Sequence, residues 1–279
     1  MLKGVKTLLS ITCSFVLIGT SVSFARNVQK TDKLNFFVVG GAQSASNEKI
    51  AKKVVGLYDL QTHGICSATL IKDRAALTAA HCIGKDISQI KIIFSTDLTG
   101  FIMDPTTTNL PIKTAVGADV YPGWDEKREN DQDDIAIVYF AGDLPQGYEY
   151  MPVISMQQTL QSGDPVLIAG FGANAVSIDP KTNKISHTGP GVLRHTQLNI
   201  SGMDEKEIFT DQAQGFGACN GDSGGPGYIQ GANDDVFLWG VISRGSGNTC
   251  SGKGKLTNVL KYMDWINSKF ANHERVDKF

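Results

Sequence analysis

The sequence lacks a strong excess of either charge, internal repeats and long low-complexity tracts. Lys and Arg together number 26 and Asp and Glu 28, which leaves a net charge of −2. No overall field therefore directs the chain to nucleic acid or to an anionic membrane. The 279 residues are 41% hydrophobic, which is enough apolar material to bury a sizeable core and argues against disorder of the whole chain.

An apolar run long enough to span a membrane is also missing, and residues 1–25 instead predict a secretory signal peptide. Lys3 and Lys6 form a basic start, residues 8–18 are largely apolar, and a small-x-small cleavage site ends at Ala25. A transmembrane anchor is the alternative, but the apolar stretch is well short of the roughly 20 residues that a span needs. We therefore expect a secreted protein, extracellular or periplasmic, with no membrane association once the signal is removed.

Cysteine is scarce. Cys13 lies in the signal segment, and the remaining cysteines are Cys66, Cys82, Cys219 and Cys250. An even number in an exported chain favours disulfide bonds, and four cysteines allow three pairings. A zinc site is the alternative, but no two of these cysteines have Cys-x-x-Cys spacing. We therefore expect no metal and no other cofactor.

Short runs rich in Val, Ile, Leu and Phe alternate with clusters of Gly, Pro, Asn and Asp, a spacing that favours an all-β barrel or sandwich. The runs cover residues 54–60, 68–71, 90–95, 135–140, 165–170, 192–200 and 236–243. Residues 259–270 instead repeat apolar side chains at helical spacing, which predicts a terminal helix docked on the body. The hydrophilic segments 126–133 and 179–188 are expected to be surface loops.

The sharpest chemical signal is the segment Gly221-Asp222-Ser223-Gly224-Gly225-Pro226. Glycines on both sides of the serine let the backbone turn tightly and expose its hydroxyl. The same letters satisfy Gly-x-Ser-x-Gly, the nucleophile elbow of α/β-hydrolases such as lipases and esterases, where an acid and then a histidine follow the serine. Here a strand-like run follows, and the later histidine, His273, lies in a polar tail. That alternative fails on context.

A base and an acid lie upstream of Ser223. His81 ends the apolar run that begins at Leu77, and Asp134 immediately precedes an apolar strand. Asp131 and Asp133 compete for the acid role, but only Asp134 is followed directly by the strand. The remaining histidines have no matching context and are expected to be surface residues: His63, His187, His195 and His273.

The segments around His81, Asp134 and Ser223, in this order, resemble the three signature segments of the chymotrypsin and trypsin family of serine peptidases. The resemblance runs from Val38 to about Phe270. It implies two antiparallel six-stranded β-barrels and a C-terminal α-helix, with the site between the barrels. The corresponding ranges are 38–150, 151–258 and 259–270.

The resemblance also implies the chemistry. Ser223 would attack a peptide carbonyl, His81 would take and return the proton, and Asp134 would orient the imidazole. The amides of Gly221 and Ser223 would form the oxyanion hole. The partners would be protein or peptide substrates and, as a further option, a proteinaceous inhibitor. The protein is expected to be a monomer. A catalytically silent relative acting as a binding module is the alternative, although such relatives usually lose a triad member.

Two disulfides follow from the resemblance, Cys66 with Cys82 and Cys219 with Cys250, and the scarcity of further cysteines fits a bacterial-style member. The family also implies a zymogen in which residues 26–37 form an activation propeptide. Once this is removed, the new amine of Val38 would pair with Asp222, because an ammonium partner offsets much of the cost of a buried carboxylate.

The specificity residues are also inferred from the family. Gly217 would occupy the floor of the primary pocket, where trypsin-like members carry an aspartate, and Gly245 with Gly254 would leave its walls open. Ser243 and Arg244 would belong to the strand that pairs with the substrate backbone. A pocket without a countercharge disfavours Arg and Lys, so we expect a large uncharged or aromatic residue before the cut.

Two departures from the family pattern weaken that expectation. Arg244 stands where the family usually has tryptophan, and Lys255 follows Gly254, so both could attract acidic substrates. Phe37 precedes the expected activation bond and is the kind of side chain an open, uncharged pocket would take. Self-activation in trans is therefore a hypothesis, with a separate activating protease as its rival.

Overall fold

The computed structural model describes residues 41–72, 74–106, 109–127, 132–154, 159–213, 215–245 and 249–276. The expected signal peptide, the propeptide and Val38 lie outside the described residues. The chain divides into two units, residues 1–34 and 35–279, and the description below concerns the second. Within the described ranges, no helix has both the length and the apolar character that crossing a membrane requires.

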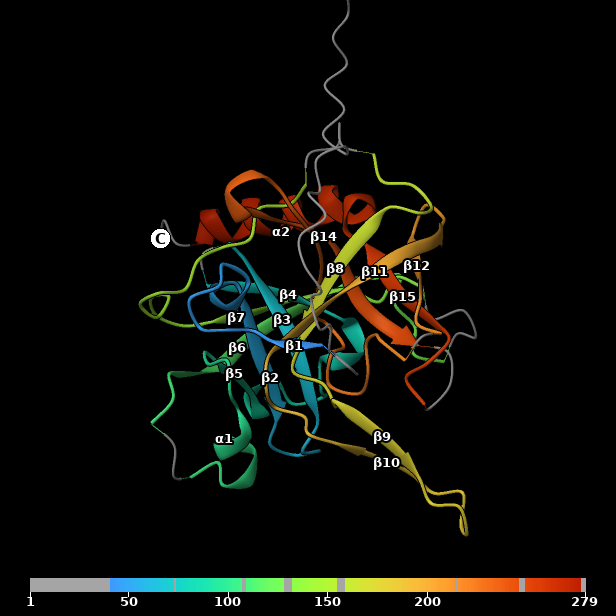
Figure 1. The fold of residues 1–279 in the computed structure, drawn as a ribbon. Helices are drawn as coiled ribbons and strands as arrows, with labels where there is room; N and C mark the ends of the chain where they lie inside the picture. The colour runs from blue at the N-terminus through green and yellow to red at the C-terminus, as the bar shows by residue number, and fades with distance from the viewer. Residues whose placement is uncertain are drawn as a thin grey trace, which may run out of the picture. The chain divides into compact units, whose positions relative to one another are not determined.

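Six antiparallel strands close into a first barrel in the order β2-β3-β4-β7-β6-β5. Their bounds are β2 Val54–Asp59, β3 Ile65–Lys72, β4 Ala75–Thr78, β5 Ile90–Ile93, β6 Ile112–Val120 and β7 Ala136–Phe140. Side chains such as Val55, Leu70 and Val138 fill its interior, as expected for strands whose alternate residues point inward. These strands lie together in the blue to green part of Figure 1.

A second ring of six strands follows, ordered β11-β12-β15-β14-β13-β8, and the pairing of β8 with β11 closes it. The bounds are β8 Pro165–Gly170, β11 Arg194–Met203, β12 Glu207–Asp211, β13 Pro226–Gln230, β14 Val236–Gly245 and β15 Lys253–Asn258. Strand β1 (Ala42–Gln43) adds to β11. Ile168, Leu198 and Trp239 belong to the core of this second barrel. The prediction of two six-stranded β-barrels is confirmed.

One apolar cluster joins the two barrels. It contains Leu77 and Ile137 from the first barrel and Leu238 and Val241 from the second. Because this cluster fixes how the barrels pack, it also fixes the loops at their junction. Those loops carry the candidate site.

The predicted C-terminal helix is also confirmed, as a 3₁₀ turn η6 (Val259–Tyr262) followed by α2 (Met263–Val276). Tyr262 packs edge-on against Tyr121 of the first barrel, with ring centroids 4.9 Å apart, and its hydroxyl donates to Asp133 at 2.8 Å. The η6 turn thus packs on the first barrel, and it also contacts β14 of the second. The helix extends beyond the predicted end at residue 270, because the polar residues that follow give no apolar period to detect.

The surface loop expected at 179–188 is wrong in part. Its second half forms β10 (Ile185–Thr188), which pairs with β9 (Ala175–Ile178) in an antiparallel hairpin, and Figure 1 shows this hairpin projecting from the barrels. The strands are mostly solvent-exposed, so their composition lacks the apolar alternation that predicts a strand. The short helices are α1 Thr99–Met103, η2 Ile50–Lys52, η3 Ala80–Cys82, η4 Ile87–Gln89 and η5 Ala232–Asp234.

Candidate active site

His81 and Asp134 are brought together by the pairing of two strands. His81 lies in η3, directly after β4, and Asp134 lies just before β7. Because β4 and β7 pair antiparallel with Thr78 opposite Ala136, the two segments meet at one end of the first barrel. Nδ1 of His81 lies 2.8 Å from Oδ2 of Asp134, and the His81 main-chain N–H donates to Oδ1 at 3.0 Å.

The Asp134 carboxylate is 2% exposed and is fixed by the second barrel as well. The Ser243 hydroxyl donates to Oδ2 at 2.6 Å, and the Thr257 hydroxyl donates to the Asp134 carbonyl at 2.9 Å. Burial raises the pKa of this carboxyl, but the hydrogen bond and charge of His81 and the Ser243 hydroxyl outweigh it and hold the pKa below its ordinary value. The group is therefore ionised across the neutral range.

The neighbouring aspartates differ from Asp134. Asp133 is buried and accepts from Tyr262 and from the Lys206 ammonium at 2.9 Å, so its carboxylate serves the docking of α2. The loop expected at residues 126–133 is therefore not solvent-exposed throughout. Asp131 lies outside the described residues.

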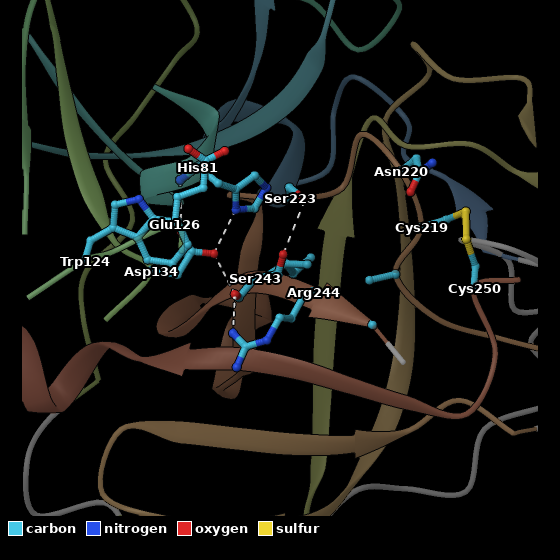
Figure 2. A pocket seen from close by; sticks show the side chains of 13 residues that line it. His81, Trp124, Glu126, Asp134, Cys219, Asn220, Ser223, Ser243, Arg244 and Cys250 are labelled. Atoms are coloured by element: carbon cyan, nitrogen blue, oxygen red, sulfur yellow. Dashed lines mark hydrogen bonds and ion pairs between the residues drawn. A yellow bond between two sulfur atoms is a disulfide. The ribbon is translucent and has the colours of Figure 1, made fainter. Parts of the chain in front are cut away.

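Ser223 lies on a tight turn that packs against the first barrel. Gly224 has φ +83°, and a Cβ built there would lie 2.0 Å from the Thr78 hydroxyl oxygen, so only glycine fits after the serine. The Ser67 N–H donates to the Ser223 carbonyl at 2.8 Å. The Ser223 hydroxyl is 3.5 Å from the Ser243 carbonyl. Figure 2 shows the His81 ring between Asp134 and Ser223.

These side chains open onto one cavity of about 380 Å³. Its lining also contains Trp124 and Glu126 on one side and the segment Ile242 to Gly245 on the other (Figure 2). Trp124 and Glu126 were not predicted, because they lie in an irregular segment with no motif. The cavity thus gives a substrate access to His81 and Ser223, with the buried Asp134 at its edge.

The backbone before Ser223 presents free amides. The Asn220 carbonyl accepts from the Ala173 N–H at 2.9 Å. In a trans peptide the C=O and the following N–H point in opposite directions, so the Gly221 N–H is directed away from Ala173. Within the part of the chain that the structure describes, neither the Gly221 nor the Ser223 N–H has a hydrogen-bond acceptor. Both amides are thus available to an anionic oxygen.

Asp222, the expected activation partner, is fully enclosed. Its carboxylate accepts from the Gly172 N–H at 2.7 Å and from the Cys219 N–H at 2.8 Å. Burial raises the pKa of Asp222 to about 7, although the two amides and the nearby Arg194 charge act in the other direction. Val38 lies outside the described residues, so its pairing with Asp222 stays a prediction.

Both disulfides that the resemblance implies are present. Cys66 is bonded to Cys82, with Cα atoms 6.1 Å apart, and Cys219 to Cys250, with Cα atoms 5.0 Å apart. Each pair has a histidine close by, but thiols that are joined in a disulfide are not available as metal ligands. The first bond fixes the His81 turn, and the second borders the cavity.

The residues expected to shape the primary pocket are not all at its surface. Gly245 lines the cavity, whereas Gly217 and Gly254 surround the side chain of Gln212. A Cβ built on Gly217 would lie 2.3 Å from Gln212 Cδ, and one on Gly254 would lie 2.3 Å from Gln212 Nε2. The expectation that Gly254 leaves the wall open is therefore wrong, because Gln212 fills that space. Gln212 belongs to no motif and was not predicted.

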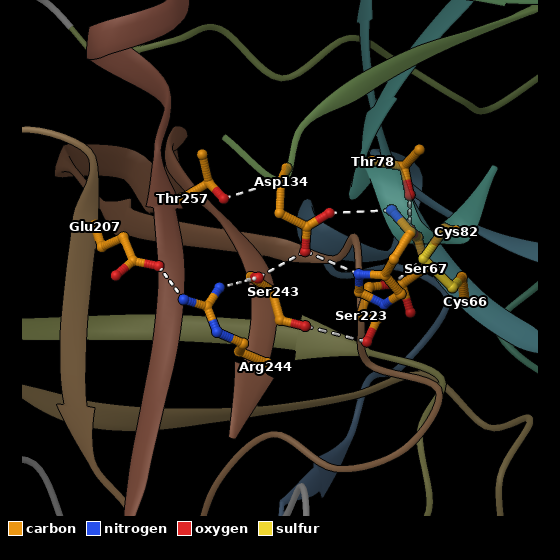
Figure 3. Close-up of polar contacts among 11 residues, drawn as sticks. Cys66, Ser67, Thr78, Cys82, Asp134, Glu207, Ser223, Ser243, Arg244 and Thr257 are labelled. Carbon is orange, nitrogen blue, oxygen red and sulfur yellow. Dashed lines mark hydrogen bonds and ion pairs between the residues drawn. A yellow bond between two sulfur atoms is a disulfide. The ribbon is translucent and has the colours of Figure 1, made fainter. Parts of the chain in front are cut away.

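Arg244 is held in an ion pair. Its Nη2 lies 2.5 Å from a carboxylate oxygen of Glu207, a residue whose side chain is 6% exposed, and Lys255 Nζ lies 3.7 Å from the other oxygen. Nη1 of Arg244 donates to the Ser243 hydroxyl at 3.0 Å. Figure 3 shows the guanidinium between Glu207 and Ser243. Arg244 is thereby linked to Asp134 through a single hydroxyl.

The other histidines lie away from this centre. His63 is exposed and contacts the Tyr58 hydroxyl at 3.0 Å. The expectation of surface positions is wrong in part, because His187 and His195 are half-buried. His195 Nδ1 lies 2.8 Å from the Ser44 hydroxyl. The side chain of His273 lies outside the described residues.

The fold and this arrangement define a chymotrypsin-like serine peptidase domain. The trypsin family model matches residues 38–266. The chain therefore belongs to the trypsin family.

Three relatives illustrate the family. Phenoloxidase-activating enzyme 1 of Spodoptera litura is 29% identical over 74% of this chain and 59% of its own length. Complement C1s subcomponent of Sus scrofa is 27% identical over 71% of this chain and 31% of its own length. Venom plasminogen activator Haly-PA of Gloydius brevicauda is 27% identical over 89% of this chain and 92% of its own length.

The chain thus spans less than two thirds of the length of the first two relatives. All three are animal proteins, so the comparison gives no support to the expectation of a bacterial-style member.

Proposed function

We propose that this protein is a secreted serine endopeptidase, made as a zymogen, in which Ser223, His81 and Asp134 act as the catalytic triad. The observation that carries the proposal is the short contact between His81 and the buried Asp134 at the edge of a cavity that Ser223 also lines. Protein or peptide substrates follow from family membership.

The chemistry proceeds through an acyl-enzyme. The Ser223 oxygen attacks the peptide carbonyl while His81 accepts its proton, and His81 then returns that proton to the leaving amine. Asp134 keeps Nδ1 protonated and stabilises the imidazolium that forms. Water then attacks the acyl-enzyme, with His81 again accepting the proton, and releases the acid product. The Gly221 and Ser223 amides hold the oxyanion in both steps, a role worth roughly 3 to 4 kcal/mol per donor in enzymes of this kind.

Activation belongs to the same proposal. Removal of residues 1–25 and then 26–37 exposes the amine of Val38, which pairs with Asp222. The support is electrostatic, because an ionised carboxylate in the buried position of Asp222 is costly without a cationic partner. The primary specificity is for uncharged side chains and excludes Arg and Lys, since Gly217 supplies no countercharge.

The test is fluorophosphonate labelling followed by turnover of peptide substrates. The proposal expects stoichiometric labelling at Ser223 and hydrolysis of internal peptide bonds. Absence of the label would favour a binding module instead. Labelling with ester cleavage but no peptide cleavage would favour an esterase.

A further inference from the structure

Gln212 is a buried polar side chain that the catalytic machinery does not use. It follows directly after β12, where its own N–H donates to the Gly252 carbonyl at 2.6 Å and its carbonyl accepts from Gly215 at 3.1 Å. The residue is 1% exposed. The main chain therefore fixes the point from which its side chain starts.

The amide of Gln212 occupies the space between three glycines. Cβ atoms built on Gly217 and Gly254 would each lie 2.3 Å from it, while one built on Gly245 would lie 4.0 Å from its Oε1. Gly245 lines the cavity beside Ser223. Oε1 is thus separated from the cavity by only the width of a glycine.

The polar atoms here have no partners within the described ranges. Gln212 Oε1 and the Thr210 hydroxyl are both buried without a hydrogen bond, and the Thr210 hydroxyl and Gln212 Nε2 both lie next to the position of a Gly254 Cβ. A buried polar group that lacks a hydrogen bond destabilises the folded protein. Neither residue lines the cavity itself, but Gln212 Oε1 lies behind Gly245, which does, so a ligand in the cavity is the candidate for the missing partner.

The charge around the amide is neutral. The nearest acidic residue in the chain, Asp211, is exposed and accepts from the Ala213 N–H. Glu207 is held by Arg244 and Lys255. Among the described residues, neither of these carboxylates is therefore placed to receive a lysine or arginine side chain beside Gln212.

We propose that Gln212 closes the floor of the primary specificity pocket and selects substrates with an uncharged carboxamide, Asn or Gln, before the cut. The inference rests on the proposed function and names its substrate class. A carboxamide N–H₂ can donate to Oε1 of Gln212, and the carboxamide oxygen can accept from the Thr210 hydroxyl. An aromatic ring is rejected because Gln212 fills the end of the pocket, and Ser or Thr is too short to reach beyond Gly245.

The test compares peptides that differ only at the residue before the cut, namely Gln, Asn, Phe, Lys and Glu. Fluorophosphonate titration gives the concentration of active sites. The wild-type protein is expected to show a kcat/KM for Gln or Asn at least about tenfold above that for Phe or Lys. In Gln212→Glu, which keeps the size of the side chain, cleavage after Lys should rise at least about tenfold. Gln197→Glu, at an exposed position on β11, is the matched control and should leave the profile unchanged.

A gain of cleavage after Lys cannot arise from misfolding. Gln212→Leu serves as the second variant and should lose the preference for Gln and Asn while still reacting with fluorophosphonate. A wild-type preference for Phe would overturn the inference, as would an unchanged profile in a labelled Gln212→Glu or Gln212→Leu protein. A wild-type protein that takes no label would overturn the proposed function itself, and this inference with it.

Discussion

The two ends of the cavity differ in how their polar groups are satisfied. At the catalytic end, both oxygens of Asp134 accept hydrogen bonds, from the His81 ring, the His81 main chain and the Ser243 hydroxyl. At the pocket end, Gln212 Oε1 and the Thr210 hydroxyl are buried without a partner in the described part of the chain. The first end is completed by the chain, whereas the second is left for a ligand to complete.

The difference explains what each end requires of its residues. A preorganised catalytic centre works because its dipoles are already oriented when the substrate arrives. A selective pocket works because the wrong substrate leaves its polar groups unpaired. Changes at the catalytic end should therefore reduce turnover for every substrate, and changes at the pocket end should alter the choice among substrates.

The largest effect should come from Ser223→Ala. We expect a folded protein whose kcat falls by about 10⁶, a magnitude established for triads of this kind, because only binding and the oxyanion amides remain. The kcat of Asp134→Asn should fall less, by about 10⁴, since the wrong imidazole tautomer is then favoured. Steady-state kinetics with far-ultraviolet circular dichroism checks both. Near-native turnover in Ser223→Ala would exclude the triad.

A smaller effect concerns Asp222 in the full-length chain. Its folded pKa of about 7 lies above the unfolded value of about 3.9, so the folded state binds the extra proton. The stability that this proton contributes is complete below pH 4 and is lost as the pH rises to about 7. It amounts to roughly 4 kcal/mol at most.

Urea unfolding from pH 3 to 9 measures this loss, with Ser223→Ala as the background to prevent self-digestion. The free energy of unfolding of Asp222→Asn relative to the parent should increase between pH 4 and 7 and then stay constant. A difference that does not vary with pH would contradict the raised pKa. In the matured chain most of this slope should disappear if Val38 pairs with Asp222.

Arg244→Met should destabilise the second barrel by about 2 to 3 kcal/mol. Among the described residues, the change leaves the buried Glu207 carboxylate with only the more distant Lys255 as an ionic partner, and breaking a buried ion pair is costly. The Ser243 hydroxyl still donates to Asp134, so kcat should change by less than about tenfold. Urea unfolding checks the first expectation, and the double variant Arg244→Met with Glu207→Gln should recover most of the loss.

The same contrast shows how far the sequence could predict this molecule. The two barrels and the helix follow from apolar periodicity, and residues such as His81 and Ser223 stand in short motifs whose local geometry is self-contained. Gln212 could not be predicted, because its role depends on three glycines that are separated in sequence and meet only in the fold. Trp124 and Glu126 could not be predicted either, because they lie in an irregular segment without a motif and only the fold brings them to the cavity.

The smallest expected effect is on the rate at which the precursor is cleaved at its activation bond. The expected activation bond, Phe37-Val38, lies outside the described residues, but its chemistry tests the pocket. An open pocket favours self-activation at Phe37, whereas a floor closed by Gln212 rejects the aromatic ring and implies a separate activating protease. We therefore expect Phe37→Gln to be converted to the Val38 form at least several-fold faster than the parent when trace active enzyme is added. Both precursors carry Ser223→Ala, so conversion reports only the added enzyme, and amino-terminal sequencing over time measures it. Conversion of the parent at a rate equal to or above that of Phe37→Gln would show that the pocket accepts phenylalanine, and would return self-activation as the route to the mature chain.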